Sequence, residues 1–246
     1  MKNYPFNLGE KGIYIIDDKI KCDKEEKDYL KQIENIYLFN KAISPYTDNT
    51  FPRIGASIWK EINSYELQII FIERYIKNLE LKKNLNLVDY YLIKYGINIL
   101  ENGKKSLNHI YKNNYKHLIE RSMKNYEICL TRVDENNLSV SEDGKFLIRN
   151  FNYLTYNLKE HDIYSYLKRL KRKKIDKNLD EIIEYYIYIS GLSKDSREYI
   201  KGLICYPNEE LRIIEKYILR KLDLDENKII ELLEKAKNMD NRAIII

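Results

Sequence analysis

Glycine and proline are scarce in this sequence, which has 8 Gly and 4 Pro among its 246 residues. Few tight turns can form with so few of these residues, and this favours a mainly helical protein. No run approaches the roughly 18 consecutive apolar residues that a membrane-spanning helix needs. The first residues, Met1 to Pro5, also lack the apolar core of a secretory signal. We therefore expect a soluble chain that is made in the cytoplasm.

Cysteine and histidine are also rare. The three cysteines, Cys22, Cys129 and Cys205, are far apart and odd in number. This argues against a disulfide framework and favours buried free thiols in a reducing compartment. The histidines do not have the spacing of a metal site, so we expect no bound metal and no other cofactor. They are expected to be surface or hydrogen-bonded side chains at His109, His117 and His161.

Charge of either sign gives no strong signal, since the formal net charge is only +5 and 33% of the residues are charged. The excess of Lys, Asn, Ile and Tyr is typical of an AT-rich genome, so basic character weighs little as evidence for a nucleic-acid partner. The densest basic cluster is the run from Lys168 to Lys174. We predict that it ends a helix, where cations complement the helix dipole. Binding of nucleic acid through residues 168–174 is the disfavoured alternative, because no aromatic residues interrupt the run.

Apolar spacing predicts the secondary structure. Residues 12–16 resemble a strand that a tight turn at Asp17-Asp18 connects to a second strand start, and a helix from Asp23 with Leu30, Ile33 and Tyr37 on one stripe should stop by Pro45. The clearest pattern spaces seven apolar residues by four and three positions from Ile58 to Leu79, which places them on one side of a long helix. Core packing of this helix is favoured over a coiled-coil seam. Further helices are expected at residues 89–111 and up to Met123.

The middle of the chain changes to strand-like patterns. Tyr126–Leu130 resembles a strand, and Asp143-Gly144 between two alternating apolar segments is a strong hairpin signal. After Glu160 the chain is predicted to be helical to its end, with Pro207 separating two helices and Asp225 capping the last one. The apolar stripes of these last helices fall at residues 179–187, 199–204, 211–222 and 229–233.

The central β segment resembles the part of kinase-like phosphotransferases that carries the catalysis. There the pattern is His-Gly-Asp, an Asn five positions after this Asp, a hairpin with a glycine turn, and a second Asp before Phe. The first Asp accepts the proton of the substrate hydroxyl, and the Asn and the second Asp hold Mg²⁺ against the nucleotide phosphates.

In this chain the spacing is kept and the carboxylates are not. Leu130 stands at the His position, Arg132 at the catalytic Asp position, and Asn137 follows Arg132 by five positions. Asn150, in Asn150-Phe151-Asn152, stands where the metal-binding Asp is expected. Arginine stays protonated and cannot accept a proton, and a neutral amide oxygen is a weak ligand for Mg²⁺. We therefore predict no catalytic residues, no bound metal and no phosphoryl transfer.

The nucleotide cradle of such enzymes is also missing from the first residues, which contain Gly9 and Gly12 but no glycine-rich loop. This argues against nucleotide binding. The predicted organisation is a remnant of the amino-terminal lobe at residues 1–30, made of short strands, and a helical kinase-like C-lobe at residues 31–246. The fold class is mainly α (α+β), with a small central β-hairpin and a truncated amino-terminal lobe.

A narrower resemblance extends over residues 30–240. Its most specific part lies towards the carboxyl end, where a Tyr, a Leu-Ser pair and a Leu-Leu-Tyr-Pro series recur in order. The segments that carry the resemblance are Leu38–Ala42, Pro52–Gly55 with Trp59, Phe71–Tyr75, Tyr91–Leu100, His161–Tyr164, Glu184–Tyr186, Gly191–Ser193 and Leu203–Pro207. With these segments the chain resembles the spore coat protein S family of the aminoglycoside phosphotransferase-like, protein-kinase-like superfamily.

The resemblance implies a degenerate, non-catalytic member of the family with a structural or assembly role. Its expected location is the spore coat, and its expected partners are other spore coat proteins. Asp162, at the start of the helix after the metal loop, would be a structural anchor. The alternative is a residual small-molecule phosphotransferase similar to aminoglycoside or choline kinases.

Overall fold

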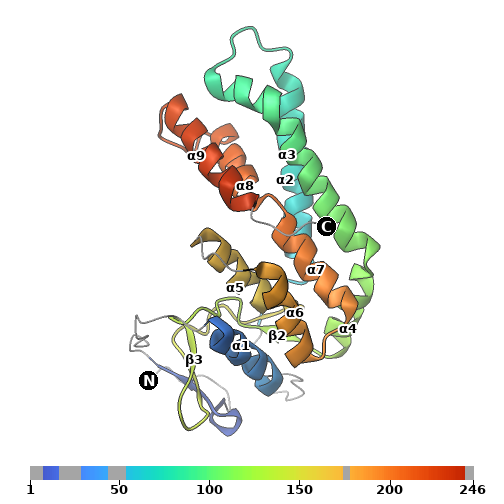
Figure 1. Ribbon diagram of the computed structural model, residues 1–246, viewed down its shortest axis with the longest axis vertical. Coiled ribbons are helices and arrows are strands. Elements are labelled where there is room, and N and C mark those ends of the chain that lie inside the picture. The colour runs from blue at the N-terminus through green and yellow to red at the C-terminus, as the bar shows by residue number, and fades with distance from the viewer. Residues whose placement is uncertain (1–7, 17–28, 44–53, 174–177, 242–246) are drawn as a thin grey trace.

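The computed structural model describes residues 8–16, 29–43, 54–173 and 178–241. Over these residues the protein is mainly helical and elongated, with its short strands at one end (Figure 1). Nine α-helices and five strands lie in the described ranges. In chain order the elements are η1 Leu8–Lys11, β1 Ile13–Ile15, α1 Tyr29–Ile43, α2 Lys60–Leu79, α3 Leu87–Lys112, α4 Tyr115–Lys124, β2 Ile128–Cys129, β3 Leu138–Val140, β4 Phe146–Ile148, β5 Thr155–Tyr156, α5 Glu160–Arg172, α6 Leu179–Ser190, α7 Lys194–Cys205, α8 Asn208–Ile218 and α9 Glu226–Asp240.

The long helices α2 and α3 pack side by side along the long axis of the molecule (Figure 1). Six of the seven residues in the predicted α2 stripe, from Ile62 to Leu79, are buried, and the first, Ile58, packs partly buried against the core. The prediction of core packing is therefore confirmed. Two glycines of α3 allow the close approach of α2, because a Cβ on Gly96 or Gly103 would meet the side chain of Ile76 or Ile69. Helices α8 and α9 cover the same end of the molecule.

Helix α1 ends at Ile43, before Pro45 as predicted, and its expected start at Asp23 lies outside the described residues. The predicted stripe is wrong at Leu30, whose exposed fraction is 39%. The buried face begins only at Gln32, because there the helix meets the chain around β3. The Gln32 Nε2 donates to the carbonyl oxygens of Val133 and Leu138 at 2.6 and 3.1 Å.

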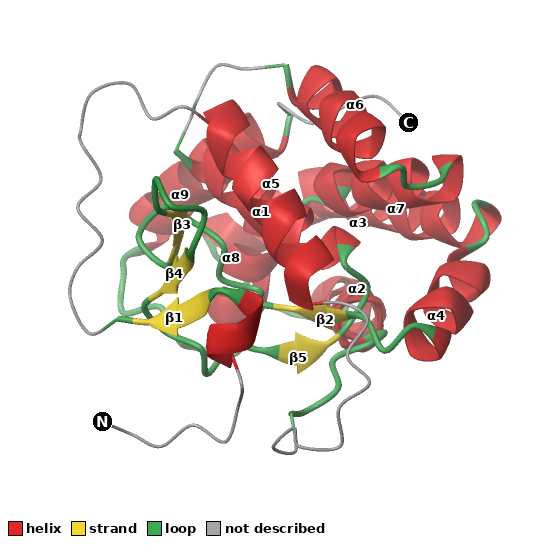
Figure 2. Ribbon diagram, turned by 90° about the horizontal axis from the view of Figure 1, so that it is seen from below, coloured by secondary structure: helices red, strands yellow, loops and turns green. Residues whose placement is uncertain are grey.

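The predicted hairpin is formed by β3 and β4, which pair antiparallel, and Gly144 in its turn has a φ of 76°, a value that suits glycine. Strand β1 adds to this hairpin in parallel with β4, so the sheet has the order β1-β4-β3 (Figure 2). Strands β2 and β5 form a separate antiparallel pair. Among the described part of the first 30 residues, β1 thus joins the sheet of the hairpin, whereas Tyr29 and Leu30 begin α1. The predicted second strand start after Asp17-Asp18 lies outside the described residues.

The carboxyl-terminal helices follow the predicted order. Pro207 separates α7 from α8, and the Asp225 side chain caps α9 by accepting the Lys228 N–H at 2.9 Å. The predicted α8 stripe is wrong at Leu222, which lies beyond the helix. Helix α8 stops at Ile218 because the chain turns at Arg220, which has a φ of 52°.

Two of the three cysteines, Cys129 and Cys205, lie in the described residues, and Cys129 is a free thiol. Cys129 is fully buried and its Sγ donates to the carbonyl oxygen of Leu158 at 2.9 Å. Cys205 is partly buried, and burial raises its pKa to about 11. Over the described ranges, none of the helices combines the length and apolar character that crossing a membrane requires.

Candidate functional site

The segment between β2 and β3 carries the residues that the sequence pattern singles out. It begins at Leu130, which is fully buried. The backbone N–H groups of Leu130 and Thr131 donate to the Asp162 carboxylate at 3.2 and 2.7 Å. Asp162 lies in the first turn of α5 and is itself fully buried, and this burial raises its pKa to about 7 although the two N–H groups oppose the rise. Asp162 therefore anchors the segment to α5.

Arg132, the residue at the expected position of the catalytic base, extends towards solvent and is 41% exposed. Its Nε lies 3.4 Å from the Asp134 Oδ2. Its guanidinium carbon lies 5.9 Å from the ring centroid of Tyr153, a distance at which a cation–π contact forms. The side chain thus lies between an acidic and an aromatic neighbour.

Asn137 and Asn150 are brought together as the sequence spacing suggests. The Asn137 Oδ1 accepts the Asn150 N–H at 2.8 Å, and its Nδ2 donates to the carbonyl oxygens of Arg132 at 2.6 Å and Asn150 at 3.2 Å. The Asn150 Oδ1 in turn accepts the Asn152 N–H at 2.9 Å. Both amide side chains therefore hold the backbone of this segment.

This donor set does not fit Mg²⁺. A hard divalent cation prefers charged oxygen ligands, whereas the residues at the two expected ligand positions are neutral amides whose oxygens already accept backbone N–H groups. In the part of the chain that the structure describes, no group of three or more His, Cys, Asp or Glu side chains is arranged to hold a metal ion.

Asp134 was not predicted as a site residue, yet it lies at the centre of this region. Its side chain is only 5% exposed, and its Oδ2 accepts from Arg132 and, at 3.1 Å, from the Arg169 Nη1 of α5. Its Oδ1 accepts the Asn136 N–H at 3.2 Å. Arg169 belongs to the basic run, but nothing in the spacing predicts that it meets a carboxylate 35 positions earlier.

A cleft of about 510 Å³ opens between this segment and α5. Its walls include five cationic side chains and one carboxylate, that of Asp134. The cations are Arg132, Lys168, Arg169, Arg172 and Lys173. We call this space the α5 cleft.

The basic run ends a helix as predicted, because α5 stops at Arg172, but its side chains do not share one face. Lys168 turns towards Glu61 of α2, with the Nζ 3.5 Å from the Glu61 Oε1. Lys171 is buried and pairs with Asp240 of α9 at 3.2 Å. Lys174, the last residue of the run, lies outside the described residues.

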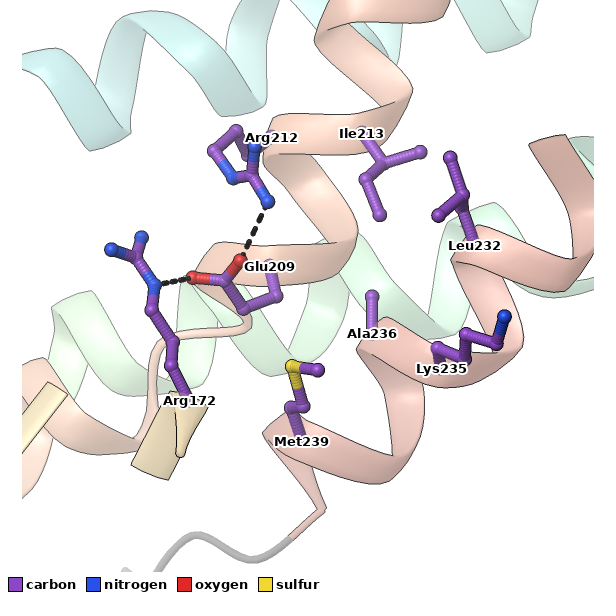
Figure 3. Close-up of a pocket in the computed structure, with 8 residues that line it drawn as sticks. All are labelled: Arg172, Glu209, Arg212, Ile213, Leu232, Lys235, Ala236 and Met239. Atoms are coloured by element: carbon purple, nitrogen blue, oxygen red, sulfur yellow. Dashed lines mark hydrogen bonds and ion pairs between the residues drawn. The ribbon is translucent and has the colours of Figure 1, made fainter. Parts of the chain in front are cut away.

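Arg172 also borders a second hollow, of about 590 Å³, between α8 and α9 (Figure 3). There Glu209 of α8 accepts from the Arg172 Nε at 2.5 Å and from the Arg212 Nη2 at 2.8 Å. The opposite wall, on α9, carries Leu232, Lys235, Ala236 and Met239, and Ile213 of α8 adds another apolar side chain (Figure 3). The two hollows therefore share Arg172 as their common border.

The three histidines take no part in either hollow. His161 is buried and its Nε2 lies 2.8 Å from the Tyr199 hydroxyl, while the His109 Nε2 lies 2.9 Å from Glu198. His117 is 69% exposed and lies 4.0 Å from Asp195. The prediction that they are surface or hydrogen-bonded side chains is confirmed.

Comparison with known proteins identifies the fold. No protein-family model matches the sequence, and no curated protein sequence matches it. Among solved structures, the chain is similar to the crystal structure of an aminoglycoside phosphotransferase from Alicyclobacillus acidocaldarius subsp. acidocaldarius DSM 446, with a TM-score of 0.66 and 12% sequence identity. The match covers 86% of this chain and 61% of that chain, so this chain spans less than two thirds of the length of its neighbour. The protein thus has a mainly helical, kinase-like phosphotransferase fold.

Proposed function

We propose that the protein is a non-catalytic, kinase-like protein that acts through contacts with other proteins. The observation that carries the proposal is Arg132, which takes the position where the pattern of the fold expects a proton-accepting carboxylate. A guanidinium stays charged at any physiological pH and cannot serve as a general base. The Arg132 side chain also pairs with Asp134 and lies over the ring of Tyr153.

The amide residues support the same proposal. Phosphoryl transfer needs divalent cations that neutralise charge on the nucleotide phosphates, and Asn137 and Asn150 contribute their side chains to backbone hydrogen bonds instead. A thermal-shift titration with Mg²⁺ and ATP tests this. We expect the melting temperature measured with ATP to be the same in the presence and in the absence of Mg²⁺. A rise that requires both Mg²⁺ and ATP would contradict the proposal.

The protein contacts that we propose serve a structural or assembly role in a spore coat. This role is supported by the ordered segments that resemble the spore coat protein S family, several of which lie in the core, as Tyr186, Leu203 and Tyr206 do. The test is the timing and place of expression. We expect the protein to appear only during sporulation and to be recovered with the coat fraction. Constant expression in growing cells, with recovery from the cytosol alone, would overturn the assignment.

A residual small-molecule phosphotransferase is the second candidate. One observation favours it: the Asp134 carboxylate lines the same cleft as Arg132 and could stand near a substrate. Two arginines contact that carboxylate, and the cleft carries an excess of positive charge that would repel a cationic substrate such as an aminoglycoside or choline. Phosphorylation of either compound by the purified protein would establish this candidate.

A further inference from the structure

We propose that the α5 cleft binds a small ligand that carries at least two phosphate groups. The proposal concerns recognition and is independent of catalysis. It rests on the charges of the cleft, on how the few carboxylates are shared among them, and on the size of the space.

The cations come from two separate parts of the chain. Arg132 lies in the segment between β2 and β3, whereas Lys168, Arg169 and Arg172 lie on successive turns of α5. Asp162 fixes the two parts against each other through the N–H groups of the segment. The cleft is therefore built by buried contacts, and its cations approach a bound ligand from two sides.

The carboxylates around the cleft do not balance these charges. Asp134 is shared by Arg132 and Arg169, so one carboxylate faces two guanidinium groups. Glu209 is shared in the same way by Arg172 and Arg212 (Figure 3). Lys168 pairs with Glu61 of α2 at 3.5 Å. Two shared carboxylates against four arginines give a surplus of two positive charges over the α5 cleft and the adjoining hollow together, because Arg212 lines only the hollow.

Glu135 is the remaining acidic group beside the cleft, and it does not remove the surplus. Its Oε1 accepts the hydroxyl of Tyr166, which lines the cleft. The negative charge of Glu135 can be counted as balancing the positive charge of Lys173, the other cation of the lining. The two shared carboxylates then still face four arginines. An anion with two or more negative charges would balance what is left.

The Arg169 side chain offers a donor for such an anion. Its Nη1 contacts Asp134, while its Nε is buried and has no hydrogen-bond partner among the described residues. A buried donor without a partner carries a free-energy cost. A guanidinium presents its N–H groups as a planar fork that matches phosphate oxygens. Because protein atoms cover the Nε, a phosphate oxygen would satisfy this unpaired donor only after the Arg169 side chain turns towards the cleft.

The size of the cleft favours a small ligand over nucleic acid. Its volume of about 510 Å³ lies in the range of roughly 300–1,000 Å³ that small-molecule sites occupy. A nucleic-acid strand needs an extended track of exposed cations. The basic run does not form such a track, because Lys168 and Lys171 turn inward to Glu61 and Asp240.

The test is isothermal titration of the full chain with inorganic triphosphate, without Mg²⁺ and without nucleotide. We expect saturable binding at one site. The double variant Arg132→Gln/Arg172→Gln should bind at least tenfold more weakly, because it removes one arginine from each shared carboxylate. The matched control is Lys77→Gln/Lys116→Gln, which removes the same charge from side chains that are 71% and 89% exposed. The control should change the affinity less than twofold.

Titrations with two other ligands distinguish an organic phosphate from nucleic acid, and a single variant serves if the double variant does not fold. Fructose 1,6-bisphosphate tests an organic ligand, and a 20-nucleotide single-stranded DNA tests nucleic acid; saturable binding of triphosphate or of the bisphosphate supports the proposal. If the double variant does not fold, Arg132→Gln alone should still weaken binding at least threefold. Binding of DNA only, no binding of either phosphate compound, or equal loss in the control variant would overturn the proposal. None of these results bears on Mg²⁺-dependent phosphoryl transfer, so failure here is distinct from failure of the proposed function.

Discussion

Asn137 forms hydrogen bonds with both backbone polar groups of Asn150: its Oδ1 accepts the Asn150 N–H at 2.8 Å while its Nδ2 donates to the Asn150 carbonyl oxygen at 3.2 Å. The same Nδ2 reaches the carbonyl oxygen of Arg132. One buried amide thus joins the segment before β3 to the segment after β4. In this chain the residue at the expected metal-ligand position is a structural clamp.

Substitution Asn137→Ala should therefore lower stability. It leaves three partly buried backbone groups without their partner, and we expect the free energy of unfolding to fall by about 2 kcal/mol. Urea unfolding followed by circular dichroism measures the change. The control is Asn98→Ala on the exposed face of α3, which should alter stability by no more than about 0.5 kcal/mol. Equal stability of Asn137→Ala and the control would contradict the clamp.

Substitution of Arg121 in α4 should lower the free energy of unfolding more than substitution of Asn137 does. Arg121 contacts two buried carboxylates at once, with its Nη2 at 2.9 Å from Glu127 and 2.8 Å from Glu160. Removal of one partner from a buried ion pair leaves an uncompensated charge, which costs about 3–5 kcal/mol. We expect Arg121→Ala to lose that much in the same unfolding assay, whereas Lys124→Ala, at the exposed end of α4, should behave as wild type.

Gly202 of α7 tests the packing against α3. A Cβ at this position would overlap the side chain of Ile110 and would lie 3.3 Å from the Ser106 carbonyl oxygen. Overpacking of a tight helix contact costs about 1–3 kcal/mol, so Gly202→Ala should lower the melting temperature although alanine favours helices. Gly55→Ala is the control, since a Cβ there meets no atom within 4 Å. A melting temperature of Gly202→Ala at or above wild type would rule out the close approach.

Much of this fold could be predicted from the sequence, because the signals are local. The four-and-three spacing of Ile62, Ile69 and Ile76 predicts α2 and its buried face, and Asp143-Gly144 predicts the hairpin. The positions of Arg132, Asn137 and Asn150 follow from spacing along one continuous segment. Contacts between distant segments could not be predicted. The pair Arg169–Asp134 and the parallel pairing of β1 with β4 depend on three-dimensional packing, for which one sequence carries no periodic signal.

Glu210 of α8 predicts a dependence of stability on pH. Burial, and then the neighbouring Asp240, raises the Glu210 pKa from 4.5 to about 7. Because the pKa is higher in the folded state, the folded state binds the proton more tightly. The stability that protonated Glu210 contributes to the folded state is therefore fully present below pH 4.5 and is lost as the pH rises through about 7.

Glu210→Gln should remove this loss. Above pH 8 the variant should be more stable than wild type by about 3 kcal/mol, since the rise of the pKa from 4.5 to about 7 is worth about 1.4 kcal/mol for each pKa unit, and below pH 4.5 the two should be equal. Urea unfolding between pH 4 and pH 8.5 measures the difference. A difference that is constant over this range would show that Glu210 does not titrate in it.

The central claim is that Arg132 replaces the catalytic base, and release of phosphate from ATP in the presence of Mg²⁺ tests it most directly. We predict that the purified protein releases no phosphate above the protein-free blank, with or without an acceptor hydroxyl compound. Asp134 is the one carboxylate that lines the α5 cleft in the described part of the chain, so Asp134→Asn is the decisive variant. Release of phosphate that accompanies the folded protein and disappears in Asp134→Asn would contradict the account.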